Sequence, residues 1–157
     1  MATTASQILG WLKKSFDEAD WSYEEFADRD SLKSTNYPLD CKLKNFDIIV
    51  NCRDDSFTFN ANIRIKADED CRLKVAEYIT RANWGLRYGC FELDFRDGEI
   101  RYRHTEDCTN WTSIPEHAFM RSVYLPKTMF ERYGDGLLAV MYGFKSPEDA
   151  IKDAEGE

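Results

Sequence analysis

The chain lacks the long hydrophobic runs and the excess of basic charge that mark membrane proteins and nucleic-acid-binding proteins. No stretch is long and apolar enough to span a bilayer. The opening residues, MATTASQILGWLKK, carry their lysines after the apolar positions, which is the reverse of a secretory signal. Acidic residues outnumber basic ones by 29 to 21, and the net charge is −8. Because binding to a phosphate backbone depends on lysine and arginine, we expect neither a nucleic acid nor a membrane as partner.

Recognisable sequence motifs for enzyme chemistry are also missing. There is no Walker A pattern, no G-x-G-x-x-G and no G-x-S-x-G. The five cysteines are odd in number, far apart in sequence and without a C-x-x-C pair. This pattern indicates reduced thiols and a cytoplasmic location. We therefore expect no cofactor, no metal site and no catalytic residue.

Histidine is scarce, and this narrows the enzymatic alternatives. The chain holds only His104 and His117. A metal site built from these two and Cys108 would lack a fourth ligand and matches no zinc spacing. The sharpest enzymatic alternative is a cysteine-dependent enzyme or redox protein that uses Cys108 as nucleophile and His104 as base. Since His104 falls at an inward strand position, a packed, hydrogen-bonded histidine is the simpler interpretation.

Two strand pairs are the strongest structural signal in the sequence. With 157 residues, of which 43% are hydrophobic, the chain has the size and composition of a single folded domain over residues 1–157. The segment Gly89–Thr105 predicts a hairpin around a two-residue Asp97-Gly98 turn, with Asp94 facing Arg101. A second hairpin is predicted from Phe46–Cys52 and Phe57–Lys66. Its register places Val50 opposite Phe59, Ile48 opposite Ala61 and Cys52 opposite Phe57.

Four stretches predict helices. A capping box at Thr4 and Gln7 begins the first, and the acidic run Asp68–Asp70 begins the second, which ends at Asn83. A capping box at Ser113–Glu116 begins the third. We expect that helix to kink or end at Pro126, with Gly134–Gly136 interrupting any continuation. A last short helix begins at Ser146–Asp149 and gives way to an acidic, frayed tail after about residue 152.

The remaining segment, residues 20–44, has no clear hydrophobic period and is interpreted as an irregular connection. The predicted order is therefore helix, two strands, helix, two strands, helices. This order is typical of an α+β fold with two layers, in which helices cover one face of an antiparallel sheet made of two hairpins.

The segment CRLKVAEYITRANWGLRYGCFELDFRDGEIRYRH, followed by a helix and then ERYGDGLLAVMYGFKSPEDAI, resembles the YbjN family of small bacterial proteins. The resemblance covers about two thirds of the chain. It implies a fold like that of type III secretion chaperones, which commonly dimerise. The family is described as sensory transduction regulators, without an agreed catalytic residue, so the resemblance transfers no active site to this chain.

These observations favour a non-enzymatic cytoplasmic module that binds protein or acts as a regulator, in the manner of a chaperone. We expect a protein or peptide partner of unknown identity, and a homodimer that covers a free sheet edge. The tryptophans at element ends and a neighbouring tyrosine offer large contact areas with a polar group. The candidate partner-binding residues are Trp84, Tyr88 and Trp111.

Overall fold

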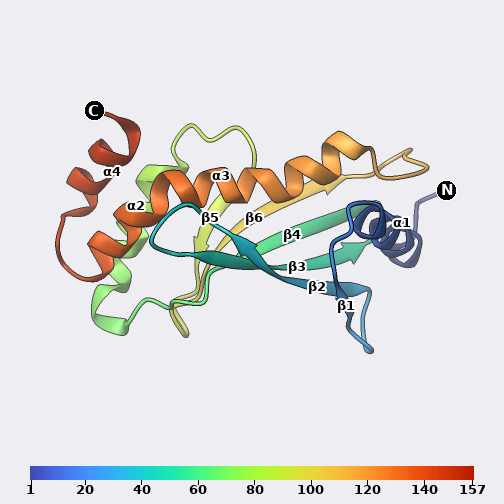
Figure 1. The fold of residues 1–157 in the computed structure, drawn as a ribbon, viewed down its shortest axis with the longest axis horizontal. Coiled ribbons are helices and arrows are strands. Elements are labelled where there is room, and N and C mark those ends of the chain that lie inside the picture. Colours follow the sequence, from blue (N-terminus) through green and yellow to red (C-terminus); the bar gives the residue numbers. More distant parts are fainter.

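The computed structural model describes residues 1–157 as one six-stranded antiparallel sheet with four α-helices (Figure 1). The strands pair in the order β1-β2-β3-β4-β6-β5. A short 3₁₀ turn at Glu69–Cys71 leads into α2. The elements are α1 (Ala5–Glu18), β1 (Glu24–Glu25), β2 (Ser31–Pro38), β3 (Asn45–Arg53), β4 (Ser56–Asn62), α2 (Arg72–Asn83), β5 (Cys90–Leu93), β6 (Ile100–Asp107), α3 (Glu116–Met141) and α4 (Pro147–Glu155).

All four helices contribute to one layer. Helix α3 runs lengthwise along the sheet, with α1 at one end and with α2 and α4 at the other (Figure 1). Alternate residues of β3 are buried, as a strand with one covered face requires. An aromatic cluster joins the layers, because Phe16 of α1 stacks 6.2 Å from Phe59 of β4 and lies 5.0 Å from Phe119 of α3. None of the helices combines the length and the hydropathy needed to cross a membrane.

The α+β class, the β3–β4 hairpin and most helix starts agree with the sequence predictions. Val50 lies opposite Phe59 in the observed register. Thr4 and Gln7 form both hydrogen bonds of a capping box, and the Ser146 side chain caps α4. Helix α2 ends at Asn83, followed by Gly85 with a positive φ.

The prediction of an irregular connection over residues 20–44 is wrong. This segment contains β1 and the eight-residue strand β2. The hydrophobic pattern fails there because two buried residues of β2 are serines: Ser34 lies on the face of Leu32, and Ser31 lies on the opposite face beside Asn51. Ser31 Oγ donates to Asn51 Oδ1 at 2.8 Å and Ser34 Oγ donates to the Ser22 carbonyl at 2.6 Å, so both polar groups are satisfied although they are buried.

The predicted register of the β5–β6 hairpin is also wrong, by two residues. Glu92, not Asp94, lies opposite Arg101. The connection is the loop Asp94–Glu99 rather than a two-residue turn, and a 2.9 Å hydrogen bond from Asp94 N to Glu99 O closes it. The cause is tertiary: Gly98 (φ 81°) packs against the backbone of Ala67, and its carbonyl accepts a 2.8 Å hydrogen bond from Ala67 N. A shift of two residues keeps the side chains of β5 and β6 on their predicted faces.

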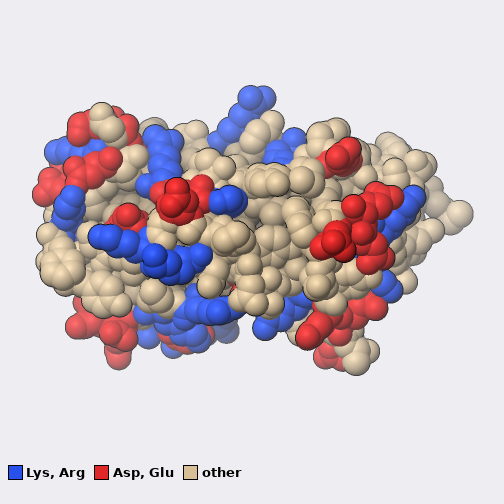
Figure 2. Space-filling model, in the orientation of Figure 1, with Lys and Arg blue, Asp and Glu red and all other residues tan.

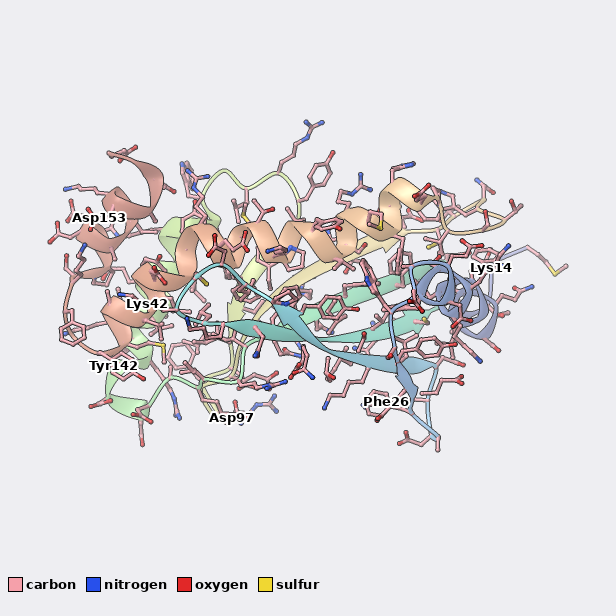
Figure 3. All side chains as sticks on the ribbon, in the orientation of Figure 1. Lys14, Phe26, Lys42, Asp97, Tyr142 and Asp153 are labelled. Atoms are coloured by element: carbon pink, nitrogen blue, oxygen red, sulfur yellow. The ribbon has the colours of Figure 1, made fainter.

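Helix α3 does not kink or end where the sequence predicts. It continues through Pro126 and the two glycines to Met141. A Cβ at Gly134 would lie 2.7 Å from the Leu43 side chain, because the β2–β3 loop docks here and Lys42 N donates to Asp135 Oδ1 at 2.8 Å. Figure 3 shows Lys42 beside α3. The glycines therefore allow close packing and do not interrupt the helix.

Two smaller predictions about helix ends fail. At the start of α3 no side chain forms a capping box, and Pro115 occupies the N-cap position. The acidic residues after 152 are not a frayed tail, since α4 continues to Glu155 and ends at Gly156 in the left-handed conformation.

Candidate functional site

Strand β6 has an uncovered half-edge. Strand β4 pairs with it along its length, from Arg101 to Asp107. On the other side β5 begins only at Cys90, which lies opposite Arg103. The outer edge from His104 to Asp107 therefore carries no strand.

The backbone groups on this half-edge face outward. Even-numbered residues point toward β4: Ile100 O accepts from Ile63 N, and Cys108 N donates to Asp55 O at 2.7 Å. Backbone groups alternate between the two sides of an antiparallel strand. The N–H and C=O groups of Thr105 and Asp107 consequently point to the uncovered side, where an extended segment can pair with them.

The loop between α2 and β5 forms a wall beside this edge. The Asn83 side chain closes the base of the loop, since its amide donates to Phe91 O at 2.9 Å and accepts from Phe91 N at 2.8 Å. Gly89 (φ 67°) returns the chain so close to β6 that a Cβ would lie 2.6 Å from the Arg103 carbonyl oxygen. The hydroxyl of Tyr102 donates to the Tyr88 carbonyl at 2.5 Å and holds the loop in place.

Tyr88 presents its ring at the mouth of the half-edge. The residue is 39% exposed, and its ring lies edge-on to His104 at 6.3 Å. Two guanidinium groups flank the ring, at 5.2 Å for Arg87 and 5.1 Å for Arg121. The exposed aromatic surface is therefore bordered by positive charge.

A buried polar network fixes Arg121 in this position. Glu106 accepts a 2.9 Å hydrogen bond from His104 Nε2 and a 3.0 Å hydrogen bond from Arg121 Nε. His104 and Glu106 are only 4% and 9% exposed. The ion pair with Arg121 offsets the desolvation cost of the buried Glu106 carboxylate. Arg87 has no such partner, so its charge remains available to a ligand.

The three aromatic residues named from the sequence do not form one patch. Tyr88 contacts the half-edge. Trp84 is 90% exposed at the C-terminal end of α2. Trp111 is half-buried and packs against the hydrophobic core, and its backbone N–H donates to Cys108 O at 2.8 Å. Of the three candidate partner-binding residues, only Tyr88 therefore adjoins the half-edge, and whether any of them binds a partner stays a prediction.

Sequence reasoning missed Arg87 and Arg121 as site residues. No local pattern marks Arg121, because its role depends on the straight path of α3 across the sheet. Arg87 adjoins Tyr88 in sequence, and an arginine next to an exposed aromatic residue is the one signal that could have identified it.

The structure does not assemble the cysteine–histidine pair of the enzymatic alternative. Cys108 is fully buried, and this burial, followed by the charge of Glu106, raises the pKa of its thiol to about 12. His104 hydrogen-bonds to Glu106, and Cys108 Sγ lies 3.9 Å from the Glu106 carbonyl oxygen. A nucleophilic cysteine needs a lowered pKa and an accessible sulfur, and Cys108 has neither.

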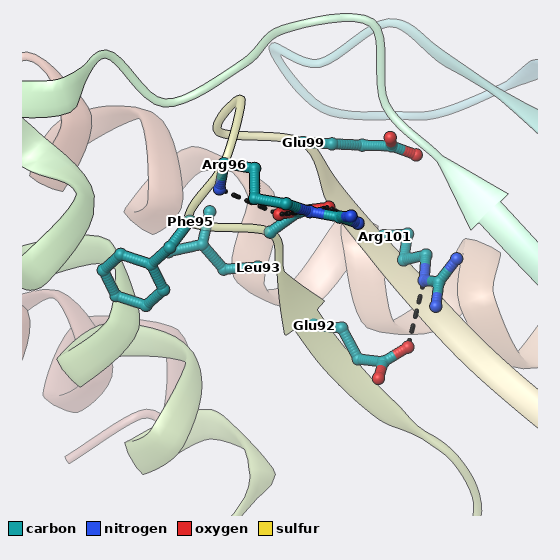
Figure 4. Close-up of a pocket in the computed structure, with 7 residues that line it drawn as sticks. Glu92, Leu93, Phe95, Arg96, Glu99 and Arg101 are labelled. Carbon is teal, nitrogen blue, oxygen red and sulfur yellow. Dashed lines mark hydrogen bonds and ion pairs between the residues drawn. The ribbon is translucent and has the colours of Figure 1, made fainter.

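The β5–β6 loop borders a polar hollow of about 380 Å³ (Figure 4). Its charges, except that of Glu99, are already paired within the protein. Arg96 lies 2.7 Å from Asp94, and Arg101 lies 3.0 Å from Glu92. Hydrogen bonds from Arg96 lower the pKa of Asp94 to about 2. The Phe95 ring turns away from these charged side chains. This hollow offers a ligand few free charges.

Comparison with known proteins supports the fold and assigns no family by sequence. No family model matches the chain, and no curated protein matches it. The crystal structure of YbjN from E. coli, described as a candidate transcription regulator, matches with a TM-score of 0.57 and 13% sequence identity. The match covers 86% of this chain and 90% of that one. The fold is therefore YbjN-like.

Proposed function

We propose that the protein is a non-enzymatic, cytoplasmic regulatory module that binds a partner protein by strand addition at the outer half-edge of β6. The observation that carries this proposal is the set of unpaired backbone groups on Thr105 and Asp107, next to the exposed ring of Tyr88. Main-chain hydrogen bonds provide affinity in such complexes, and neighbouring pockets select side chains. The YbjN-like fold, and the regulatory role suggested for YbjN itself, support this proposal.

The surroundings of the edge define the chemistry of the partner. A segment lying along Thr105 passes Tyr88, which can stack with an apolar or aromatic side chain. Arg87 and Arg121 flank that ring, and Arg87 is unpaired. The partner segment is therefore extended, carries an apolar residue for Tyr88 and has an acidic residue near Arg87.

A peptide selection followed by matched variants tests the proposal. Peptides selected for binding to the wild-type protein are measured against Thr105→Pro and Thr105→Val. Proline removes the outward N–H and valine keeps it, so we expect about a tenfold or greater loss of affinity with proline and little loss with valine. Tyr88→Ala should also weaken binding, whereas Tyr88→Phe, which keeps the ring, should not.

The outcomes distinguish a foreign partner segment from a second copy of this chain as the occupant of the edge. Equal affinity of the proline and valine variants would exclude strand addition at Thr105. If light scattering shows a dimer of the wild-type protein that the proline variant converts to monomer, the occupant of the edge is a second copy of the chain and the proposal of a foreign partner fails. Near-ultraviolet circular dichroism of both variants checks that the fold is retained.

A further inference from the structure

A hollow of about 260 Å³ lies between the end of α1 and the start of α3. Its floor is apolar, because Ile114 and Phe119 are buried there beside the half-buried Trp21 and Met120. Glu18 and Glu116 add carboxylates to its lining. Small-molecule sites usually have volumes of about 300–1,000 Å³. This hollow is smaller, which suits a single side chain of a protein partner.

Trp21 connects this hollow to a second, more open one of about 500 Å³, lined also by Asp17, Asp20 and Tyr23. The Trp21 ring is held in place by the rings of Tyr37 at 5.7 Å and Phe119 at 5.6 Å. A rigid, half-exposed tryptophan between two hollows is a favourable anchor, since little side-chain entropy is lost when a partner binds.

The carboxylates around Trp21 are mostly without a cationic partner. Asp17, Asp20 and Glu116 form no ion pair, and Glu18 has only Lys14 at 3.8 Å on the exposed surface. Residues 13–30 contain seven acidic and three basic side chains. Figure 2 shows that Asp and Glu gather at the α1 end of this face. The surface therefore attracts positive charge, in contrast to the arginine-flanked edge beside Tyr88.

We propose that this surface binds a cationic amphipathic segment of a partner protein. One aliphatic side chain enters the 260 Å³ hollow against Phe119, and flanking lysines or arginines pair with Glu18 and Glu116 on one side and with Asp17 and Asp20 on the other. A cation placed over the Trp21 ring adds a cation–π contact. The apolar floor and the unpaired carboxylates complement such a segment in shape and in charge.

Fluorescence anisotropy of a labelled Lys/Leu amphipathic peptide, compared with its Glu/Leu counterpart, tests the surface. The full-length protein should bind the basic peptide, and binding should weaken as salt is raised. Glu116→Lys and Asp17→Lys should each lower affinity about fivefold. Both residues are exposed, so the fold tolerates the change. The control Glu157→Lys makes the same change of net charge in the exposed terminus and should leave affinity nearly unchanged.

A second pair of variants tests the hollow itself. Ala19→Leu fills the hollow and should reduce binding of the basic peptide, whereas Ala76→Leu on α2, also at a half-buried position, should not. Equal effects of Glu116→Lys and Glu157→Lys would show attraction by net charge alone and overturn the proposal. Unchanged binding to Ala19→Leu, or loss of binding in Thr105→Pro, would also overturn it, since the latter result would place the peptide at the β6 edge.

Discussion

The hydroxyl of Tyr78 donates a 2.6 Å hydrogen bond to the carbonyl oxygen of Tyr133. This bond brings α2 so close to α3 that a Cβ at Gly136 would collide with the Tyr78 hydroxyl. Burial also raises the pKa of Tyr78, so the phenol stays a hydrogen-bond donor at neutral pH. Glycine at position 136 is therefore a requirement of helix packing.

Gly136→Ala should destabilise the protein by about 1–3 kcal/mol, because the added methyl group forces α2 and α3 apart. Gly10→Ala is the matched control. Gly10 lies within α1 with open space around it, and alanine there should stabilise the protein by up to about 1 kcal/mol. Thermal unfolding measures both changes. Similar stabilisation by both substitutions would contradict the close packing of Tyr78 on α3.

Gly98→Val should destabilise the protein by more than Gly143→Val. Both glycines have a positive φ, of 81° and 76°, so valine is strained at either position, by about 1–2 kcal/mol. Only at Gly98 would the Cβ also meet the backbone of Ala67, whereas Gly143 has open space. Urea unfolding of the two variants separates the conformational cost from the steric one. Equal losses would mean that the β5–β6 loop does not pack on Ala67.

The sequence predicted those features in which local pattern and tertiary packing agree. The β3–β4 register follows from alternation together with the short turn at Arg53–Ser56, and the structure places Val50 opposite Phe59 as predicted. The β5–β6 register was missed because contact with Ala67 favours a longer loop over the two-residue turn. Strand β2 was missed because its buried serines are satisfied by partners distant in sequence, such as Asn51.

The candidate site was predictable only in part, for the same reason. Tyr88 was identified from its place near the end of a helix, a purely local signal. Arg121 lies 33 positions later in the sequence and reaches the Tyr88 ring only because α3 passes through Pro126 and both glycines without ending. The half-edge of β6 is free because β5 begins only at Cys90, which lies opposite Arg103. This pairing follows from the shifted register.

The order of thiol reactivity distinguishes the proposed binding module from a cysteine-dependent enzyme. Cys41 and Cys90 are half-buried, whereas Cys52 and Cys108 are buried. Excess iodoacetamide at neutral pH should therefore modify Cys41 and Cys90 first. Cys52 and Cys108 should react only after unfolding, as peptide mass spectrometry would show. Rapid alkylation of Cys108 in the native protein would restore the enzymatic alternative.

Cys52 and Cys108, two of the three buried thiols, should make the fold sensitive to alkaline pH. Burial raises the pKa of Cys52 and of Cys108 to about 12, whereas a thiol in the unfolded chain titrates near about 8.5. Between these values the folded state binds more protons than the unfolded state, so the free energy of unfolding falls as pH rises. Below about pH 7.5 both states keep the thiols almost fully protonated, and the two groups contribute almost no pH dependence.

With respect to these groups, the urea midpoint should therefore be nearly constant from about pH 6.5 to 7.5 and should decline from about pH 8.5 to 10. Over that range the free energy of unfolding should fall by at most about 1.4 kcal/mol per pH unit for each thiol. A Cys52→Ala, Cys108→Ala double variant is less stable overall, because it loses buried sulfur contacts, yet its stability should decline less steeply over that range. Tyr78 and Tyr102, whose pKa values are also raised by burial, add to the decline only above about pH 10. Identical slopes for the wild-type protein and the double variant would mean that these thiols ionise without unfolding the chain, and that Cys108 is more accessible in solution than its position beneath Glu106 implies.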